Sequence, residues 1–169
     1  MLFRSALEQL ATTDVLTGAL NRRRFLELAE QELARAARYR HPLCLAMLDL
    51  DHFKSINDRF GHAAGDEALR AVTDVVRSGL RTVDLLGRYG GEELMVALPE
   101  TGRDAAIVAL ERIRTEVSLL RLRSVDATVC VSGGLVEMLD GESLEAGLRR
   151  ADAALYEAKR AGRNRVIVA

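Results

Sequence analysis

Two pairs of acidic residues have the side chains and the spacing expected of a site that handles phosphate groups. Asp49 and Asp51 end a strongly apolar run, and Glu92 and Glu93 follow two adjacent glycines. Carboxylates at the end of a buried strand can hold Mg²⁺, which prefers oxygen ligands and often joins a carboxylate to substrate phosphates. Either pair alone is also typical of solvated surface charges. Both pairs on neighbouring strands would form a two-metal clamp for phosphoryl transfer.

Apolar periodicity predicts the elements that would position these carboxylates. It indicates helices over residues 21–40, 52–59, 65–80, 103–120 and 143–161, and strands over residues 43–49, 84–89, 93–98, 127–138 and 165–168. The glycine pair before Glu92 predicts a hairpin, because glycine accepts the positive φ angles of tight turns. A hairpin inside an otherwise alternating order predicts a mixed sheet with helices over it. Gly133 and Gly134 indicate a bulge or a close backbone approach in their strand.

Length and composition fit one globular domain. The 169 residues are 49% hydrophobic, which excludes a disordered chain. Lys and Arg number 24 against 25 Asp and Glu, and this balance argues against the positive footprint of a nucleic-acid-binding protein. The longest apolar run is too short to span a bilayer, so we expect no membrane contact. Cys44 and Cys130 lack metal-ligand spacing, and we expect reduced thiols in a cytoplasmic protein.

Residues 1–13 are interpreted as a helical stub ahead of a domain at residues 14–169. Phe3, Leu7 and Leu10 recur at the spacing of an amphipathic helix. This helix could pack on its own domain, or it could be the end of a signalling linker in a longer protein. Three positions leave both alternatives open, because a coiled coil needs several heptads.

A series of short motifs runs from Asp14 to the C-terminus. The motifs are Asp14-Val15-Leu16-Thr17-Gly18, Asn21-Arg22-Arg23 with Phe25, Asp49-Leu50-Asp51-His52-Phe53-Lys54, Ile56-Asn57-Asp58, Gly61-His62, Gly65-Asp66, Gly90-Gly91-Glu92-Glu93-Leu94, Ala151-Asp152, Ala154-Leu155-Tyr156, Ala158-Lys159 and Gly162-Arg163-Asn164. In this order and spacing they resemble the GGDEF-domain diguanylate cyclases, with a Gly-Gly-Glu-Glu-Leu form of the signature. Leu94 replaces the usual Phe and should pack into the core.

The resemblance implies a fold and a reaction. The fold would be α+β, a mixed five-stranded sheet wrapped by helices, ferredoxin-like and similar to the palm of polymerases and nucleotide cyclases. Residues 14–169 would be the catalytic domain. The reaction would condense two GTP into cyclic di-GMP and two pyrophosphates, each 3′-hydroxyl attacking the α-phosphate of the other GTP. No side-chain nucleophile is needed, because the protein positions phosphates, neutralises charge and helps remove a proton.

A catalytically idle domain, acting as a receptor for GTP or cyclic di-GMP, is the alternative. Degenerate family members lose the acidic signature or the metal aspartate, whereas Asp49, Lys54, Glu92 and Glu93 are all present here, so the enzyme is favoured. One site would hold one GTP, so two copies would meet in a transient C2 homodimer. The resemblance also implies an upstream sensor domain in a longer bacterial protein.

The resemblance assigns catalytic and metal-binding roles to individual residues. Asp49, the Leu50 carbonyl, Glu92 and Glu93 match the ligands of two Mg²⁺ ions, which Mn²⁺ could replace. Glu92 also matches the group that helps deprotonate the 3′-hydroxyl. Glu92, Glu93 and Lys54 are therefore the expected catalytic set.

Five residues match substrate-binding positions of the family. Asn57, His62 and Asp66 match the guanine pocket, and Lys159 and Arg163, together with Lys54 of the catalytic set, match residues near the phosphates. A carboxylate can accept hydrogen bonds from the N1–H and 2-amino groups of guanine, and adenine lacks that donor pair. The resemblance therefore implies GTP rather than ATP as the substrate.

An Arg-x-x-Asp pair, Arg81 and Asp84, matches the family's inhibitory product site. The arginine could donate to guanine O6 and N7 while the aspartate accepts from the opposite edge of the base. Arg112, on the next expected helix, would supply a second arginine to bound cyclic di-GMP. By itself the pair is typical of a local salt bridge.

Overall fold

The computed structural model describes residues 11–169. Phe3, Leu7 and Leu10 lie outside the described residues, so the helical stub stays a prediction. No helix in the described part of the chain is long and apolar enough to cross a membrane. Cys44 and Cys130 are both free thiols.

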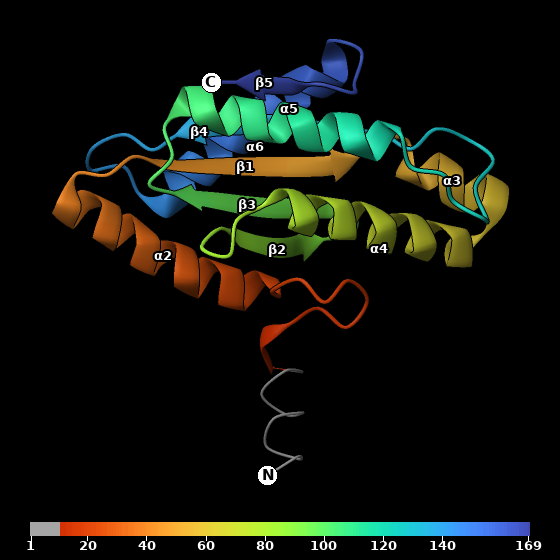
Figure 1. The fold of residues 1–169 in the computed structure, drawn as a ribbon, viewed down its shortest axis with the longest axis horizontal. Helices are drawn as coiled ribbons and strands as arrows, with labels where there is room; N and C mark the ends of the chain where they lie inside the picture. The colour runs from red at the N-terminus through yellow and green to blue at the C-terminus, as the bar shows by residue number, and fades with distance from the viewer. Residues whose placement is uncertain (1–10) are drawn as a thin grey trace.

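Five strands form one mixed sheet at the centre of the domain (Figure 1). They are β1 (Leu43–Leu50), β2 (Leu85–Gly90), β3 (Glu93–Pro99), β4 (Val131–Glu137) and β5 (Val166–Val168). Their spatial order is β2-β3-β1-β4-β5, in which β4 and β5 are parallel and the other neighbours are antiparallel. The predicted mixed five-stranded sheet is confirmed.

Helices cover both faces of this sheet, and the described ones are α2 (Arg22–Tyr39), α3 (Phe53–Phe60), α4 (His62–Gly79), α5 (Arg103–Ser118) and α6 (Leu144–Arg160). The even-numbered residues 44–50 of β1 join the core with α4 and α5, and the odd-numbered residues 43–47 join the core with α2 and α6. Because both faces of β1 are covered, nearly all of its residues are apolar. Leu94 is fully buried, as expected.

Two element starts differ from the sequence-based expectation by three residues or more, and the other boundaries agree within two residues. α4 begins at His62 rather than at residue 65, because Gly61, with a φ of 90°, ends α3 and the next helix starts at once. β4 begins at Val131 rather than at residue 127. Its antiparallel partner β1 ends at Leu50, directly opposite Val131, so the earlier residues have no strand to pair with.

Gly134 brings α6 into close contact with the sheet. A Cβ atom at this position would overlap the carbonyl oxygen of Ala151 and the amide nitrogen of Leu155. The register of β4 against β1 is regular here, with Met47 opposite Gly134. The structure therefore shows a close backbone approach rather than a bulge, and this approach seats the helix that carries Lys159.

Candidate active site

Two of the four acidic side chains, Asp49 and Glu93, meet across neighbouring strands. Asp49 of β1 and Glu93 of β3 are direct partners in the antiparallel ladder. Directly opposed residues project to the same face of a sheet. Glu92 lies in the turn before Glu93, and its carbonyl oxygen accepts a 3.4 Å hydrogen bond from the amide of Leu50. The turn bends at Gly91, which has a φ of 52°.

Lys159 of α6 is the cation of this cluster. Its Nζ atom lies 3.0 Å from Oδ2 of Asp49, whose side chain is only 6% exposed. Burial raises the pKa of Asp49 to about 6, opposed by Lys159 and reinforced by the charges of Glu92 and Glu93. Burial also raises the pKa of Glu93, and the charge of Asp152 adds to that effect. One ammonium group therefore compensates the crowded carboxylates only in part.

Asp51 lies on the same side of the sheet as Asp49, as alternation predicted, because it accepts a hydrogen bond from Ser132, the direct partner of Asp49 on β4. β1 ends at Leu50, and the Asp51 side chain turns toward other segments. Its Oδ1 accepts a 2.7 Å hydrogen bond from the hydroxyl of Ser132, and its Oδ2 accepts a 3.0 Å bond from the amide of Asn164. Asp51 therefore joins three parts of the chain instead of facing Glu93.

Asn57 and Asp66 lie on the packed helices α3 and α4. The Oδ1 atom of Asn57 is buried and has no hydrogen-bond donor among residues 11–169. Gly65 makes room for it, because a Cβ atom there would overlap this oxygen. Asp66 follows on α4 and is partly buried, and His62 is exposed at the helix start. The helix pair thus presents an unsatisfied acceptor.

Lys54 and Arg163 do not contact the carboxylate cluster. The ammonium of Lys54 lies 2.7 Å from Asp58, and its side chain is 89% exposed. Arg163 lies in the loop after α6 and is also exposed. Its guanidinium has no hydrogen bond or ion pair within residues 11–169. Of the three expected phosphate-binding cations, the structure brings only Lys159 to Asp49.

Arg81 and Asp84 form a local ion pair between α4 and β2. The Asp84 side chain is 3% exposed and accepts bonds from both the backbone amide and the guanidinium of Arg81. Arg81 also donates to the carbonyl of Pro99 and the hydroxyl of Thr101. Arg112 donates a 2.8 Å hydrogen bond to the carbonyl of Gly79, two residues before Arg81. The three residues thus lie around the connection between α4 and β2, and the Arg81 guanidinium is already hydrogen-bonded to other residues of the domain.

A family model described as the diguanylate cyclase GGDEF domain matches residues 11–165. The chain belongs to the GGDEF domain family. Diguanylate cyclase DgcP of Pseudomonas aeruginosa is 45% identical over an alignment of 172 positions that covers 99% of this chain and 26% of that protein. Diguanylate cyclase DgcM of Escherichia coli is 41% identical over an alignment of 167 positions that covers 96% of this chain and 40% of that protein. The chain therefore spans less than half the length of these relatives.

Solved GGDEF structures share the fold. Diguanylate cyclase SiaD of Pseudomonas aeruginosa, solved in complex with its activator SiaC, aligns with a TM-score of 0.91 and 41% identity over 99% of this chain and 65% of that chain. The coiled coil and GGDEF domain of DgcB from Caulobacter crescentus, in complex with cyclic di-GMP, aligns with a TM-score of 0.91 and 40% identity over 99% of this chain and 92% of that chain.

The donor chemistry of this GGDEF domain fits a hard divalent cation. Asp49, Glu92 and Glu93 offer carboxylate oxygens, and the Leu50 carbonyl lies on the same strand end. Within residues 11–169, no three acidic, histidine or cysteine side chains already converge as ligands. The crowded, partly compensated carboxylates favour added positive charge, so these residues fit Mg²⁺.

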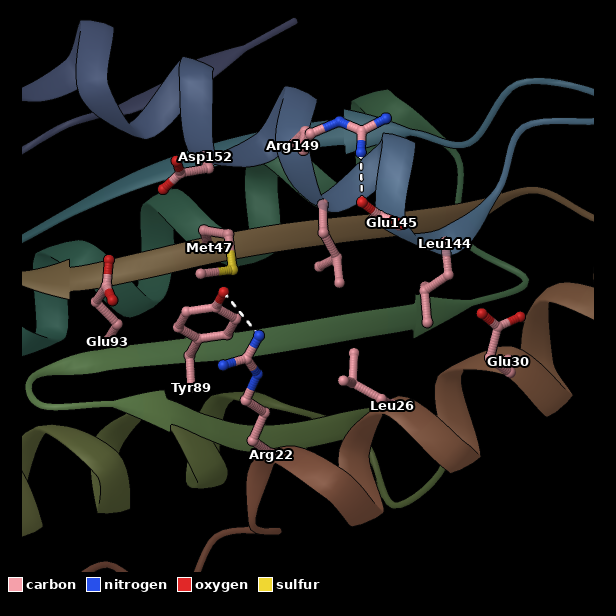
Figure 2. A pocket seen from close by; sticks show the side chains of 11 residues that line it. Arg22, Leu26, Glu30, Met47, Tyr89, Glu93, Leu144, Glu145, Arg149 and Asp152 are labelled. Atoms are coloured by element: carbon pink, nitrogen blue, oxygen red, sulfur yellow. Dashed lines mark hydrogen bonds and ion pairs between the residues drawn. The ribbon is translucent and has the colours of Figure 1, made fainter.

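Sequence reasoning missed a cavity beside the signature turn of the GGDEF domain (Figure 2). The cavity measures about 680 Å³ and lies between α2 and α6, with Met47 on its floor. Glu93 and Asp152 flank one end of it, and the guanidinium of Arg22 lies over the Tyr89 ring. Asp152 belongs to the motif Ala151-Asp152, and the sequence motifs alone give it no role. Its position seven residues before Lys159, on one face of a helix, was the available signal.

Proposed function

We propose that this GGDEF domain condenses two GTP into cyclic di-GMP and two pyrophosphates. The pairing of Asp49 with Glu93 across the ladder, with Lys159 beside them, carries the proposal. It gathers charge of both signs at a strand end, as phosphoryl transfer requires. The names of the relatives support the same reaction. We place the domain in the cytoplasm, where GTP is available.

Mg²⁺ or Mn²⁺ would be held by Asp49, Glu92, Glu93 and the Leu50 carbonyl, as two ions per site. Bound ions supply charge neutralisation and polarise phosphoryl oxygens. Glu92, in the exposed turn, accepts the proton of the attacking 3′-hydroxyl.

The remaining residues bind and orient GTP. Lys159 neutralises phosphate charge from α6, and Lys54 and Arg163 turn from solvent toward the phosphates when nucleotide binds. Asp66 and the unsatisfied Oδ1 of Asn57 accept from the N1–H and 2-amino groups of guanine. ATP lacks this donor pair and would leave both acceptors unpaired.

Catalysis on this scheme needs two copies of the domain. One site holds one GTP while the product joins two, so the active faces meet with C2 symmetry.

Arg81, Asp84 and Arg112 form a separate site at which cyclic di-GMP inhibits the enzyme. DgcB, solved with cyclic di-GMP, supports product binding in the family. This chain covers only 26% and 40% of the two curated relatives, which supports a longer protein with an upstream sensor domain.

The decisive experiment incubates the chain with GTP and Mg²⁺ and separates the products by chromatography. We expect cyclic di-GMP, at a rate per molecule that rises with protein concentration because two domains must meet. ATP should give no cyclic product. GTP binding without product would support the idle-receptor alternative and contradict the enzyme. A rate per molecule that stays constant on dilution to a proven monomer would contradict the dimeric mechanism.

A further inference from the structure

The loop after α6 has an unusual backbone. Gly162, Arg163 and Asn164 follow one another with φ angles of 112°, 65° and 45°. Residues with a side chain rarely adopt this left-handed region, and they remain there only where their surroundings hold them. Arg163 is one of the expected phosphate-binding residues, and its guanidinium has no partner within residues 11–169. The position of that guanidinium therefore depends on how firmly the loop backbone is held.

One anchor of the loop comes from the end of β1. Oδ2 of Asp51 accepts a 3.0 Å hydrogen bond from the amide of Asn164. The second oxygen of the same carboxylate accepts a 2.7 Å bond from the hydroxyl of Ser132 on β4. Asp51 is 5% exposed, so this contact is sheltered from water. It ties the loop to a residue only two positions beyond Asp49.

A second anchor of the loop comes from α5. Nη1 of Arg114 donates a 2.9 Å hydrogen bond to Oδ1 of Asn164. Glu111 orients this arginine, because its Oε2 accepts a 2.7 Å bond from Nε of Arg114. Oε1 of Glu111 accepts a 3.1 Å bond from the amide of Val166, at the start of β5. Both ends of the segment 164–166 are thus fixed to one helix.

We infer that Asp51, Glu111 and Arg114 are positioning residues that hold the loop 162–166 so that Arg163 reaches the phosphates of GTP. The inference rests on the proposed function. Asp51 connects the loop to the strand of Asp49, and the pair on α5 holds the Asn164 side chain. None of the three needs to touch the nucleotide. Their removal leaves Arg163 in the chain but spreads it over many loop conformations.

The test measures binding of 3′-deoxy-GTP with Mg²⁺ by calorimetry, because this nucleotide lacks the attacking hydroxyl and cannot be consumed. Arg114→Ala and Asn164→Gly each remove the hydrogen bond between Arg114 and the Asn164 side chain, and glycine tolerates the φ of Asn164. We expect each variant to bind the nucleotide about fivefold more weakly, because the loop loses one hydrogen bond that orders it. Asn164→Asp keeps an acceptor for Arg114 and should bind as the wild type does.

The same change in an Arg163→Ala background separates positioning from general damage. If Arg114 acts through Arg163, then Arg114→Ala should weaken binding no further in that background. The matched control is Arg149→Ala, which removes an exposed arginine paired with Glu145 on α6 and should leave binding unchanged.

Three outcomes would overturn the inference. Additive losses from Arg114→Ala and Arg163→Ala would show that the two residues act separately. A lowered melting temperature with unchanged nucleotide affinity would assign the contacts to stability alone. A wild-type chain that does not bind 3′-deoxy-GTP would overturn both this inference and the proposed function. A wild type that binds but forms no product would overturn only the proposed catalysis, because the binding comparison still decides the role of Arg114.

Discussion

Nη1 of Arg88 lies 3.0 Å from both carboxylate oxygens of Asp14, across 74 residues of sequence. The same guanidinium uses Nε and Nη2 to donate to the Gly91 carbonyl at 2.9 and 2.7 Å. One side chain on β2 therefore joins the segment before α2 to the signature turn. Burial by itself raises the pKa of Asp14, but hydrogen bonds from Thr17 and Arg88 outweigh it and leave that pKa below its usual value.

Breaking this ion pair should lower the stability of the domain. Both side chains are about four-fifths buried, so we expect Arg88→Ala to lower the free energy of unfolding by about 2 kcal/mol. Because the pKa of Asp14 is depressed, the contribution is present above pH 4 and is lost as the pH falls further. The difference between thermal melts of wild type and Arg88→Ala should therefore shrink from pH 7 to pH 3, and the part due to the bonds with the Gly91 carbonyl should remain. Arg149→Ala is the exposed control, and an equal loss there would contradict the prediction.

Removing the charge of Asp49 should stabilise the metal-free domain. Its pKa of about 6 in the folded state, against 3.8 unfolded, means that the folded state binds a proton more tightly. Stability of the metal-free wild type therefore falls as the pH rises from about 4 to about 6. We expect the free energy of unfolding of Asp49→Asn to exceed that of the metal-free wild type by about 1–3 kcal/mol above pH 6 and to equal it near pH 4.

The same variant tests the metal assignment. Mg²⁺ should raise the melting temperature of the wild type in the presence of GTP and leave Asp49→Asn unchanged, because ligands stabilise only the state that binds them. Turnover should be lost in the variant. Retained wild-type activity would remove Asp49 from the metal site.

Glu92→Gln should lower kcat far more than it changes the KM for GTP. Loss of a positioned general base commonly costs about 10²- to 10⁴-fold in rate. Steady-state kinetics with GTP and Mg²⁺ give both constants. An effect confined to KM would indicate that Glu92 only binds substrate.

The motif order predicted the fold and the pairing of acidic strands, because both follow from local patterns. Apolar runs predict β1 and β3, and the glycine pair predicts the hairpin between β2 and β3 that carries Glu93. Contacts between distant side chains were not predictable in this way. Arg88 and Asp14 are each ordinary charged residues in sequence, and their geometry depends on the completed sheet.

The direction of individual side chains was also beyond the sequence. Alternation placed Asp51 on the side of Asp49, but it did not show that Asp51 bonds to Ser132 and Asn164 instead of facing Glu93. Matching motifs placed Lys54 and Arg163 with the phosphates, whereas both point into solvent without nucleotide. Long, flexible charged side chains settle by small differences in solvation, which residue type alone does not encode.

Arg112→Ala should relieve product inhibition with little effect on stability. Within residues 11–169 this residue donates only to the Gly79 carbonyl, whereas Arg81 also donates to Pro99 and Thr101, so Arg112 is the cleaner variant. We expect cyclic di-GMP to bind about tenfold more weakly and the initial rate of GTP turnover to persist. Calorimetry and rates with added product measure both. Equal inhibition of wild type and variant would return this surface to a purely structural role.

Gly134→Ala should destabilise the domain, because its Cβ would overlap the backbone of α6. Overpacking of this kind costs about 2 kcal/mol or more, which lowers the melting temperature by about 4–8 °C. Gly102→Ala is a matched control, since its nearest contact is 3.9 Å away and its φ is −79°. The control should change stability by less than about 1 kcal/mol. Similar melting temperatures for both variants would contradict the close approach.

The central place of β1 in the sheet has a consequence for synthesis. Its two partners, β3 and β4, begin roughly 40 and 80 residues later in the chain. A ribosome adding about 5–20 residues per second exposes β1 for several seconds before both its edges are paired. During that interval an apolar strand with open backbone groups on each side is a template for self-association. Nascent chains that stop before Val131 should therefore aggregate, and a chaperone that binds extended apolar segments should hold them at residues 43–50.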